Sequence, residues 1–257
     1  VDHADGVLNL NGDTKYEASI HNGGTSSTSL KFWKAGKVNV AKNATMEIDN
    51  GTVLVEGAEL NIAGYATAKG VITGNGTINF TEKEAKLAAQ EGLTINHKFG
   101  DSYKVERING VYGIYHYVAS VNDVNYESLK AALQALTDGA TLTLLEDITE
   151  EAWDCHTITA KNVTINGARK TVTFNNLASG EAALCIDSDV TVMNITLVLD
   201  AEGNAIISTG NAENVTISGS TFTNANVNIS ASKKVVFDNN KLVGGDVIIT
   251  SYSNAVD

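Results

Sequence analysis

The amino-acid sequence predicts an all-β fold in which short parallel strands coil into a solenoid, a parallel β-helix. Three observations support this prediction: short apolar alternations repeat along the chain, Asn or Gly follows them at a fixed distance, and proline is absent. The 257 residues include 27 Asn, 26 Thr and 23 Gly but no Pro. Asn, Thr and Gly are weak helix formers, so a helical bundle is disfavoured. A proline would interrupt the hydrogen-bond ladders that join successive coils, so its absence fits this fold.

The first repeat covers residues 36–80. Apolar and polar residues alternate there over three or four positions, and a small polar turn separates the alternations. These strands are shorter and closer together than those of a β-sandwich. Three strands in each coil would give a repeat of about 20–25 residues, within the range of solenoids. The predicted strands are centred on 38–40, 46–48, 53–55, 60–62, 70–72 and 77–80.

The second repeat is longer, and its register can be checked. Four strands begin at Val163, Val190, Val215 and Val235, which are 27, 25 and 20 residues apart. Two positions after each strand comes Gly or Asn, the residues that best tolerate the left-handed backbone of a sharp corner. Another series of strands recurs every 20 to 22 residues. The corner residues are Gly167, Asn194, Gly219 and Asn239, apolar residues follow at Leu197, Phe222 and Leu242, and the other series covers 183–186, 205–208, 226–229 and 246–249.

The stretch between the two repeats contains different signals. Residues 81–84 form a capping box, which predicts a helix over 81–90. Further along, Asn109-Gly110 separates two alternating segments, 103–108 and 111–117, and this pattern predicts a β-hairpin.

A second helix is predicted over 126–136, where apolar residues share one face. Placed before the first coil of the second repeat, this helix would cover the open end of the core and its unpaired edge. We therefore expect two β-helical modules. The first, residues 1–118, would include the first helix and a connecting hairpin, and the second, 119–257, would begin with the capping helix.

Residues 118–148 contain a distinctive succession of features. A strand leads to Tyr126, a Leu- and Ala-rich helix follows, Asp138-Gly139 forms a turn, and a Thr-rich strand ends in Leu144-Leu145-Glu146-Asp147. This succession resembles the opening of right-handed parallel β-helix modules in adhesin-like surface proteins of gut bacteria and archaea, within the pectate-lyase-like superfamily. The resemblance implies this architecture. It does not choose an activity, because the superfamily includes lyases, hydrolases, tailspikes and adhesins.

Charge and composition restrict the partners. The net charge is −12 and the pI is about 4.8, so the surface repels phosphate backbones and nucleic acid is not an expected partner. No run of 18 apolar residues is present that could span a membrane. The chain begins Val-Asp-His-Ala-Asp, without a signal peptide, and is expected to be a mature or excised piece of a longer protein. An acidic chain rich in Thr and Asn favours an extracellular or cell-surface location.

Carboxylates were considered as catalytic groups, because glycoside hydrolysis needs a pair of them and Ca²⁺-dependent lyases need acidic ligands beside a basic residue. The candidates are Asp187, Asp189, Asp200, Glu202 and Asp246. Asp187 and Asp189 would share one face of a strand. Neighbouring coils place Thr209, Ser230 or nearby neutral residues at the matching positions, so no acidic cluster is expected. We therefore predict no catalytic residues.

A dense acidic patch near His156 was considered as a cation site. Its members are Glu146, Asp147, Glu150, Glu151 and Asp154. Their spacing matches neither an EF-hand nor a repeat-type calcium site, so an exposed loop is the favoured interpretation. Neither a metal nor a cofactor is expected.

The two cysteines and the threonine pairs have structural explanations. Cys185 lies in an apolar run and is expected to face the core as a small hydrophobic residue. Cys155 is 30 residues earlier, about one coil, so a bridge between adjacent coils stays open. The Thr-x-Thr pairs are not expected to recur at one coil position, so no threonine face suited to ice binding is predicted.

Exposed aromatic residues could serve as platforms for sugars. The candidates are Trp33, Trp153, Tyr112 and Tyr115. We expect Tyr112, Tyr115 and Tyr117 instead to pack the hairpin against the solenoid.

These observations favour a non-enzymatic, adhesin-like surface protein, a stiff spacer whose long face binds carbohydrate or a surface protein. The alternative is a polysaccharide lyase or glycoside hydrolase of the pectate-lyase-like group, disfavoured by the missing carboxylate cluster. A phage fibre or tailspike module is the third candidate. Because the chain ends soon after a coil strand, assembly end to end or within a longer chain is also expected.

Overall fold

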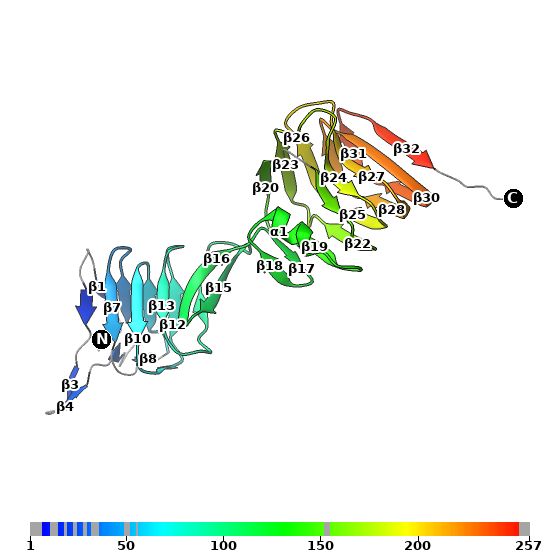
Figure 1. Cartoon of the computed structure of the whole chain (residues 1–257). Coiled ribbons are helices and arrows are strands. Elements are labelled where there is room, and N and C mark those ends of the chain that lie inside the picture. Colours follow the sequence, from blue (N-terminus) through cyan, green and yellow to red (C-terminus); the bar gives the residue numbers. More distant parts are fainter. Residues whose placement is uncertain are drawn as a thin grey trace. The chain divides into compact units, whose positions relative to one another are not determined.

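The computed structural model describes residues 7–10, 15–17, 20–22, 25–27, 30–31, 36–48, 52–54, 56–151 and 155–251. The fold is all-β: within these residues, short strands stack as about nine solenoid turns, and a single short α-helix is present. The chain divides into two compact units, Val1–His116 (unit 1) and Tyr117–Asp257 (unit 2). Each unit stacks its own parallel strands (Figure 1). The predicted parallel β-solenoid is confirmed.

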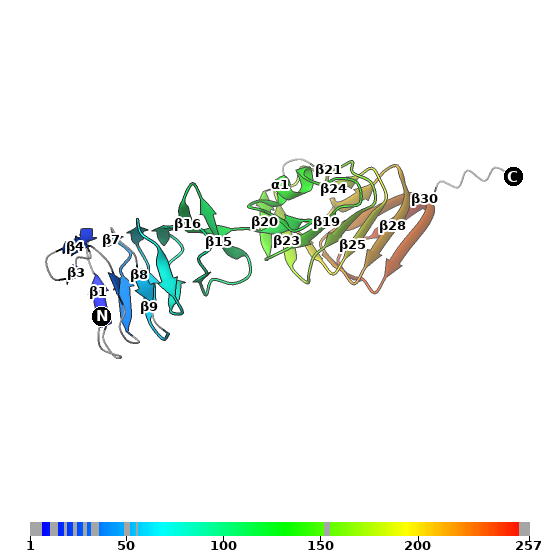
Figure 2. The same ribbon diagram turned by 90° about the horizontal axis from the view of Figure 1, so that it is seen from below.

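Unit 1 has three walls, and successive strands of the chain pass from wall to wall (Figure 2). The first wall consists of β1 (Val7–Leu10), β6 (Lys37–Val40), β9 (Glu59–Ile62), β12 (Thr77–Phe80) and β14 (Ile95–Asn96). The second contains β2 (Lys15–Glu17), β7 (Thr45–Ile48), β10 (Tyr65–Ala68) and β13 (Lys86–Ala88). The third contains β5 (Leu30–Lys31), β8 (Thr52–Leu54) and β11 (Ile72–Gly74). The strands β3 (Ile20–Asn22) and β4 (Thr25–Ser27) form a separate antiparallel pair.

The coil length of unit 1 is slightly shorter than predicted. Lys37 pairs with Glu59 and Glu59 with Thr77, separations of 22 and 18 residues. The predicted strands are present, with β11 displaced by two residues, and Val55 lies outside the described residues. Strand β10 was missed because Ala66 and Ala68, which point into the core, are small and give a weak apolar signal.

The helix predicted over 81–90 is wrong. Residues 86–88 form β13, which pairs in parallel with β10. Ala85, Leu87 and Ala89 are buried in alternation, the period of a strand, and Leu87 is fully buried in the core of unit 1. Packing on the next coil therefore outweighs the local helix preference of the capping box.

An antiparallel pair is formed by β15 (Tyr103–Ile108) and β16 (Val111–His116). Both turn residues have positive φ, 51° at Asn109 and 86° at Gly110, as a two-residue hairpin turn requires. Strand β16 also pairs antiparallel with β13, so it extends the second wall of unit 1. Tyr112 is buried there against the core.

Unit 2 also stacks three walls (Figures 1 and 2). The first contains β19 (Thr141–Leu144), β22 (Val163–Asn166), β25 (Val190–Met193) and β28 (Ala212–Ser218), with β17 (Ala119–Val121) and β18 (Val124–Tyr126) added antiparallel. The second contains β20 (Ile148–Glu151), β23 (Thr171–Asn175), β26 (Thr196–Leu199), β29 (Thr221–Thr223) and β31 (Lys241–Val243). The third contains β21 (His156–Ile158), β24 (Ala182–Ile186) and β27 (Ala205–Thr209). The long strand β30 (Asn226–Asp238) pairs with both β27 and β28, and β32 (Val247–Ser251) pairs with β30.

The register predicted for unit 2 is confirmed. Val163, Val190, Val215 and Val235 are successive pairing partners in the first wall. Three of the four predicted corners have positive φ, namely 53° at Asn194, 59° at Gly219 and 52° at Asn239. At the fourth corner the positive φ values belong to Ala168 and Arg169. Gly167 is required there for space, since a Cβ would overlap Ile195 and the carbonyl of Asn194.

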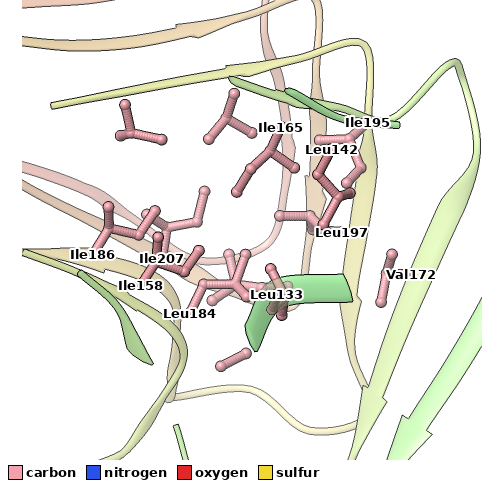
Figure 3. Close-up of a cluster of buried hydrophobic side chains, with 14 of the residues drawn as sticks. Leu133, Leu142, Ile158, Ile165, Val172, Leu184, Ile186, Ile195, Leu197 and Ile207 are labelled. Atoms are coloured by element: carbon pink, nitrogen blue, oxygen red, sulfur yellow. The ribbon is translucent and has the colours of Figure 1, made fainter. Parts of the chain in front are cut away.

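The core of unit 2 is a stack of aliphatic and aromatic side chains from all three walls (Figure 3). The helix α1 (Leu129–Gln134) adds Leu129, Ala132 and Leu133 to this core, and Ser128 caps its N-terminus by accepting from the backbone N–H of Ala131. The helix is shorter than the predicted 126–136, because Tyr126 belongs to β18.

Threonine rows form on the outer surface of unit 2, contrary to prediction. Thr171, Thr196 and Thr221 are successive partners in the second wall. The pairs Thr171/Thr173 and Thr221/Thr223 therefore occupy the same coil position, with Thr196 and Val198 between them. Threonine suits the pleated outer surface of a sheet, where its branched side chain packs against the neighbours in the row.

Candidate functional site

A row of asparagine side chains runs along the outer surface of the first wall of unit 1. In β6, β9 and β12 one Asn stands between two buried apolar residues, so its side chain points outward. The Nδ2 groups of Asn39, Asn61 and Asn79 each donate to Oδ1 of the Asn one coil earlier at 2.8 Å, and Nδ2 of Asn96 does so at 3.3 Å. We call Asn9, Asn39, Asn61, Asn79 and Asn96 the Asn row.

A groove of about 610 Å³ lies at the β9, β12 and β14 end of this wall. Its lining residues are Glu59, Asn61, Thr77, Asn79, Phe80, Thr81, Asn96, His97, Lys98 and Phe99. We call it the Asn groove, because three members of the Asn row lie in it. Sequence reasoning did not identify any of these residues as a site.

Two rings form one end of the Asn groove. The rings of His97 and Phe99 are stacked, with centroids 5.9 Å apart and an interplanar angle of 10°. Phe99 also meets Tyr103 edge to face at 6.0 Å, and Tyr103 stacks on His116 at 4.5 Å. The partly exposed Phe99 ring is thus held in place by neighbouring rings and presents an apolar surface beside the amides.

Glu59 is the one carboxylate among the ten lining residues. Its Oε1 lies 2.9 Å from Nζ of Lys37, and its Oε2 accepts from Nδ2 of Asn61 at 3.4 Å. The hydrogen bond from Lys37 lowers the pKa of Glu59. Burial raises this pKa, and Asn61 and the charge of Lys98 lower it further, so that the net direction is down. Glu59 is therefore ionised at neutral pH, and Lys37 matches its charge.

The carboxylates considered from the sequence do not form a catalytic pair. Asp187 and Asp189 lie in the turn between β24 and β25, not on one strand. Asp189 accepts the backbone N–H groups of Glu213 at 2.6 Å and Asn214 at 2.9 Å, and Nδ2 of Asn214 at 2.7 Å. Burial raises the pKa of Asp189, but these hydrogen bonds outweigh it and the pKa is lowered. Asp189 thus ties one coil to the next. Of the remaining candidates, Asp200 accepts from the backbone N–H of Asn176 at 3.0 Å, and Glu202 and Asp246 are exposed.

The acidic patch near His156 is not the exposed loop that we predicted. Glu150 and Glu151 lie on β20, and Asp154 lies outside the described residues. Oδ1 of Asp147 accepts the backbone N–H of Thr171 at 2.7 Å. Glu151 accepts from Asn175 and Asn176 of the next coil. Within the described residues, no three His, Cys, Asp or Glu side chains gather closely enough to bind a metal ion.

His156 is expected to make the stability of unit 2 sensitive to mild acid. Burial lowers its pKa below 6.5; Glu150, whose Oε1 lies 3.8 Å from Nε2, raises it, and Lys130 lowers it. A base with a lowered folded pKa binds its proton better in the unfolded chain, so stability is full above pH 6.5 and falls as the pH drops below that value. His156 is the only histidine in residues 117–257. Urea unfolding of unit 2 at several pH values should show a decline below pH 6.5 that is smaller in His156→Gln. An equal decline in both proteins would contradict this assignment.

A disulfide joins Cys155 to Cys185, with Cα atoms 6.0 Å apart. The prediction that Cys185 faces the core is wrong, because Leu184 and Ile186 of the same strand point inward and leave Cys185 on the outer side. The bridge links strands β21 and β24 of adjacent coils.

The aromatic candidates occupy structural positions or fall outside the described residues. Tyr112 and Tyr117 are buried and Tyr115 is partly buried. The hydroxyl of Tyr112 accepts the backbone N–H of Leu93 at 3.0 Å. Trp33 and Trp153 lie outside the described residues. Phe99 and His97 were missed because they stand alone in the sequence, without a repeated aromatic pattern.

In the described part of the chain, no helix has the length and apolar surface that crossing a bilayer requires. Comparisons of the sequence with protein-family models, and of the chain with curated proteins and solved structures, find no match.

Proposed function

We propose that the chain is a non-enzymatic, adhesin-like protein of the cell surface or extracellular space, which carries a carbohydrate-binding groove on a stiff right-handed β-solenoid. The observation that carries the proposal is the Asn groove, where the amides of Asn61, Asn79 and Asn96 lie beside the rings of His97 and Phe99. Two β-helical modules, a connecting hairpin and a capping helix complete the proposed architecture.

The chemistry of the Asn groove suits a sugar. A pyranose ring has a face of C–H groups, which packs on an aromatic ring, and a rim of hydroxyl groups that both donate and accept hydrogen bonds. Phe99 offers the apolar platform, and each Asn amide offers N–H donors and a carbonyl acceptor. Few polar groups beside an apolar surface are typical of small-molecule sites.

The proposal is non-enzymatic because the Asn groove contains a single carboxylate. Glycosidases place two carboxyl groups about 5–9.5 Å apart on either side of the scissile bond. Glu59 is already paired with Lys37 and has no second carboxylate among the lining residues. This arrangement supports recognition of a sugar without its cleavage.

The proposed location rests on the disulfide and on the fold. Disulfides persist in oxidising surroundings and are rare in the cytosol, and Cys155–Cys185 joins two coils covalently. Each coil contacts only its neighbours, so a solenoid is an extended body suited to holding a binding surface away from its attachment.

Phe99→Ala is expected to weaken binding on a glycan array about tenfold or more, because an aromatic contact contributes about 1.5 kcal/mol. The matched control is Tyr65→Ala, which removes a 37% exposed ring on β10, in the second wall of the same unit. Tyr65→Ala should bind as the wild type does. A reducing-end assay on the same glycans should detect no release.

The outcomes separate the alternatives. Release of reducing ends would overturn the non-enzymatic proposal in favour of a hydrolase or lyase. Equal losses in both variants would remove the Asn groove as the site. No binding to any glycan would overturn carbohydrate recognition and direct the search to a protein partner.

A further inference from the structure

The Asn row extends beyond the Asn groove. The groove covers the coils of Asn61, Asn79 and Asn96, and the same line of hydrogen-bonded amides continues to Asn39 on β6 and Asn9 on β1. Successive rungs of a parallel sheet are about 4.8 Å apart. The first wall of unit 1 therefore presents one amide per coil in a straight line perpendicular to its strands.

Each amide has unused hydrogen-bonding groups. An Asn side chain has two N–H donors and two acceptor positions. Within the described residues, Asn39 and Asn79 each donate once to the preceding Asn and accept once from the following one. One donor and one acceptor remain on each, and in Asn61 the second N–H is directed at Glu59. The row thus repeats the same pair of groups from coil to coil.

A ligand that fits this row must itself repeat. A linear polysaccharide presents hydroxyl groups at regular intervals along an extended chain, and each hydroxyl can satisfy the donor or the acceptor of an amide. An extended peptide would be expected to pair with the edge of a sheet through its backbone, not with the outer face of a sheet. A single terminal sugar would use Phe99 and the nearest amide and would gain nothing from Asn39.

We infer that the ligand of this protein is a linear polysaccharide that lies along the Asn row, with successive sugars over successive coils and with one end of the contact at Phe99. This inference rests on the proposed carbohydrate binding and adds the kind of glycan and its direction. Binding should strengthen with chain length until the row is covered.

The test is titration calorimetry with cello-, chito-, xylo- and galacturono-oligosaccharides of two to six units. In at least one series the affinity should rise steadily from two to five units. Asn39→Ala should leave the affinity for the two-unit sugar unchanged and weaken that for the six-unit sugar about fivefold, the effect of one hydrogen bond. Phe99→Ala should weaken both.

Asn39→Thr repeats the experiment with a residue that favours strands and removes the amide, in case Asn39→Ala unfolds. Circular dichroism of each variant establishes that it is folded. An affinity that does not depend on length, or a loss in the Asn39 variants that is the same for short and long sugars, would overturn the inference but leave carbohydrate binding intact. Binding on the array to branched or terminal sugars alone would also overturn it. Failure of the proposed function itself would appear as no glycan bound at all.

Discussion

Replacing Phe222 by alanine is expected to lower the free energy of unfolding of unit 2 by about 3–5 kcal/mol, the usual effect of removing a buried phenyl ring. Phe222 is fully buried. It pairs with Leu197 on one side and Leu242 on the other, and its ring centroid lies 6.1 Å from that of Phe237. Its loss would leave a cavity between three coils, which cannot collapse without moving the hydrogen-bonded strands. Urea unfolding followed by circular dichroism measures the effect.

The matched control for Phe222 is its neighbour on β29. Thr223 points outward from the same strand, so Thr223→Ala should lower the free energy of unfolding by less than about 1 kcal/mol. Phe222→Leu should fall between the two, because most of the apolar volume is retained. Equal small effects for Phe222→Ala and Thr223→Ala would show that the register of the second wall is incorrect.

Removal of the disulfide should have the next largest effect. Cys155→Ser together with Cys185→Ser opens a loop closed across 30 residues, for which loop entropy predicts about 3 kcal/mol. Wild-type protein in excess reductant should unfold at the same urea concentration as the double variant, and oxidised wild type at a higher one. Unit 1 has no cysteine and should be unaffected. If reductant leaves the wild-type transition unchanged, the bridge is absent from the protein.

The parts of the fold that were predictable from sequence are those in which one residue fixes the register. A slip of one residue would turn Val163, Val190 and Val215 from the core to the solvent, so their common spacing to a corner Asn or Gly was informative. The helix over 81–90 failed for the opposite reason. Its capping box is a local signal, whereas the burial of Leu87 depends on β10, a strand that the sequence barely marks.

The Asn groove was not predictable in the same way. Asn39, Asn61 and Asn79 each stand at the centre of an apolar alternation, and this pattern was visible in the sequence. That they form one row depends on coils of 22 and 18 residues, whose lengths differ and follow from the turns. The contact between the rings of His97 and Phe99 depends on the conformation of a loop that has no repeat. The threonine rows were missed because the coils between them were taken to be out of register.

The turns of unit 2 differ in length although its strands remain paired. Six residues separate β23 from β24, five separate β26 from β27, and two separate β29 from β30. The side of the solenoid formed by these turns has therefore accepted insertions and deletions while the ladder of strands stayed constant. Peptide tags or whole domains could be grafted there, for example between Leu199 and Ala205. In evolutionary terms, the strands preserve the scaffold and the turns are free to acquire new loops.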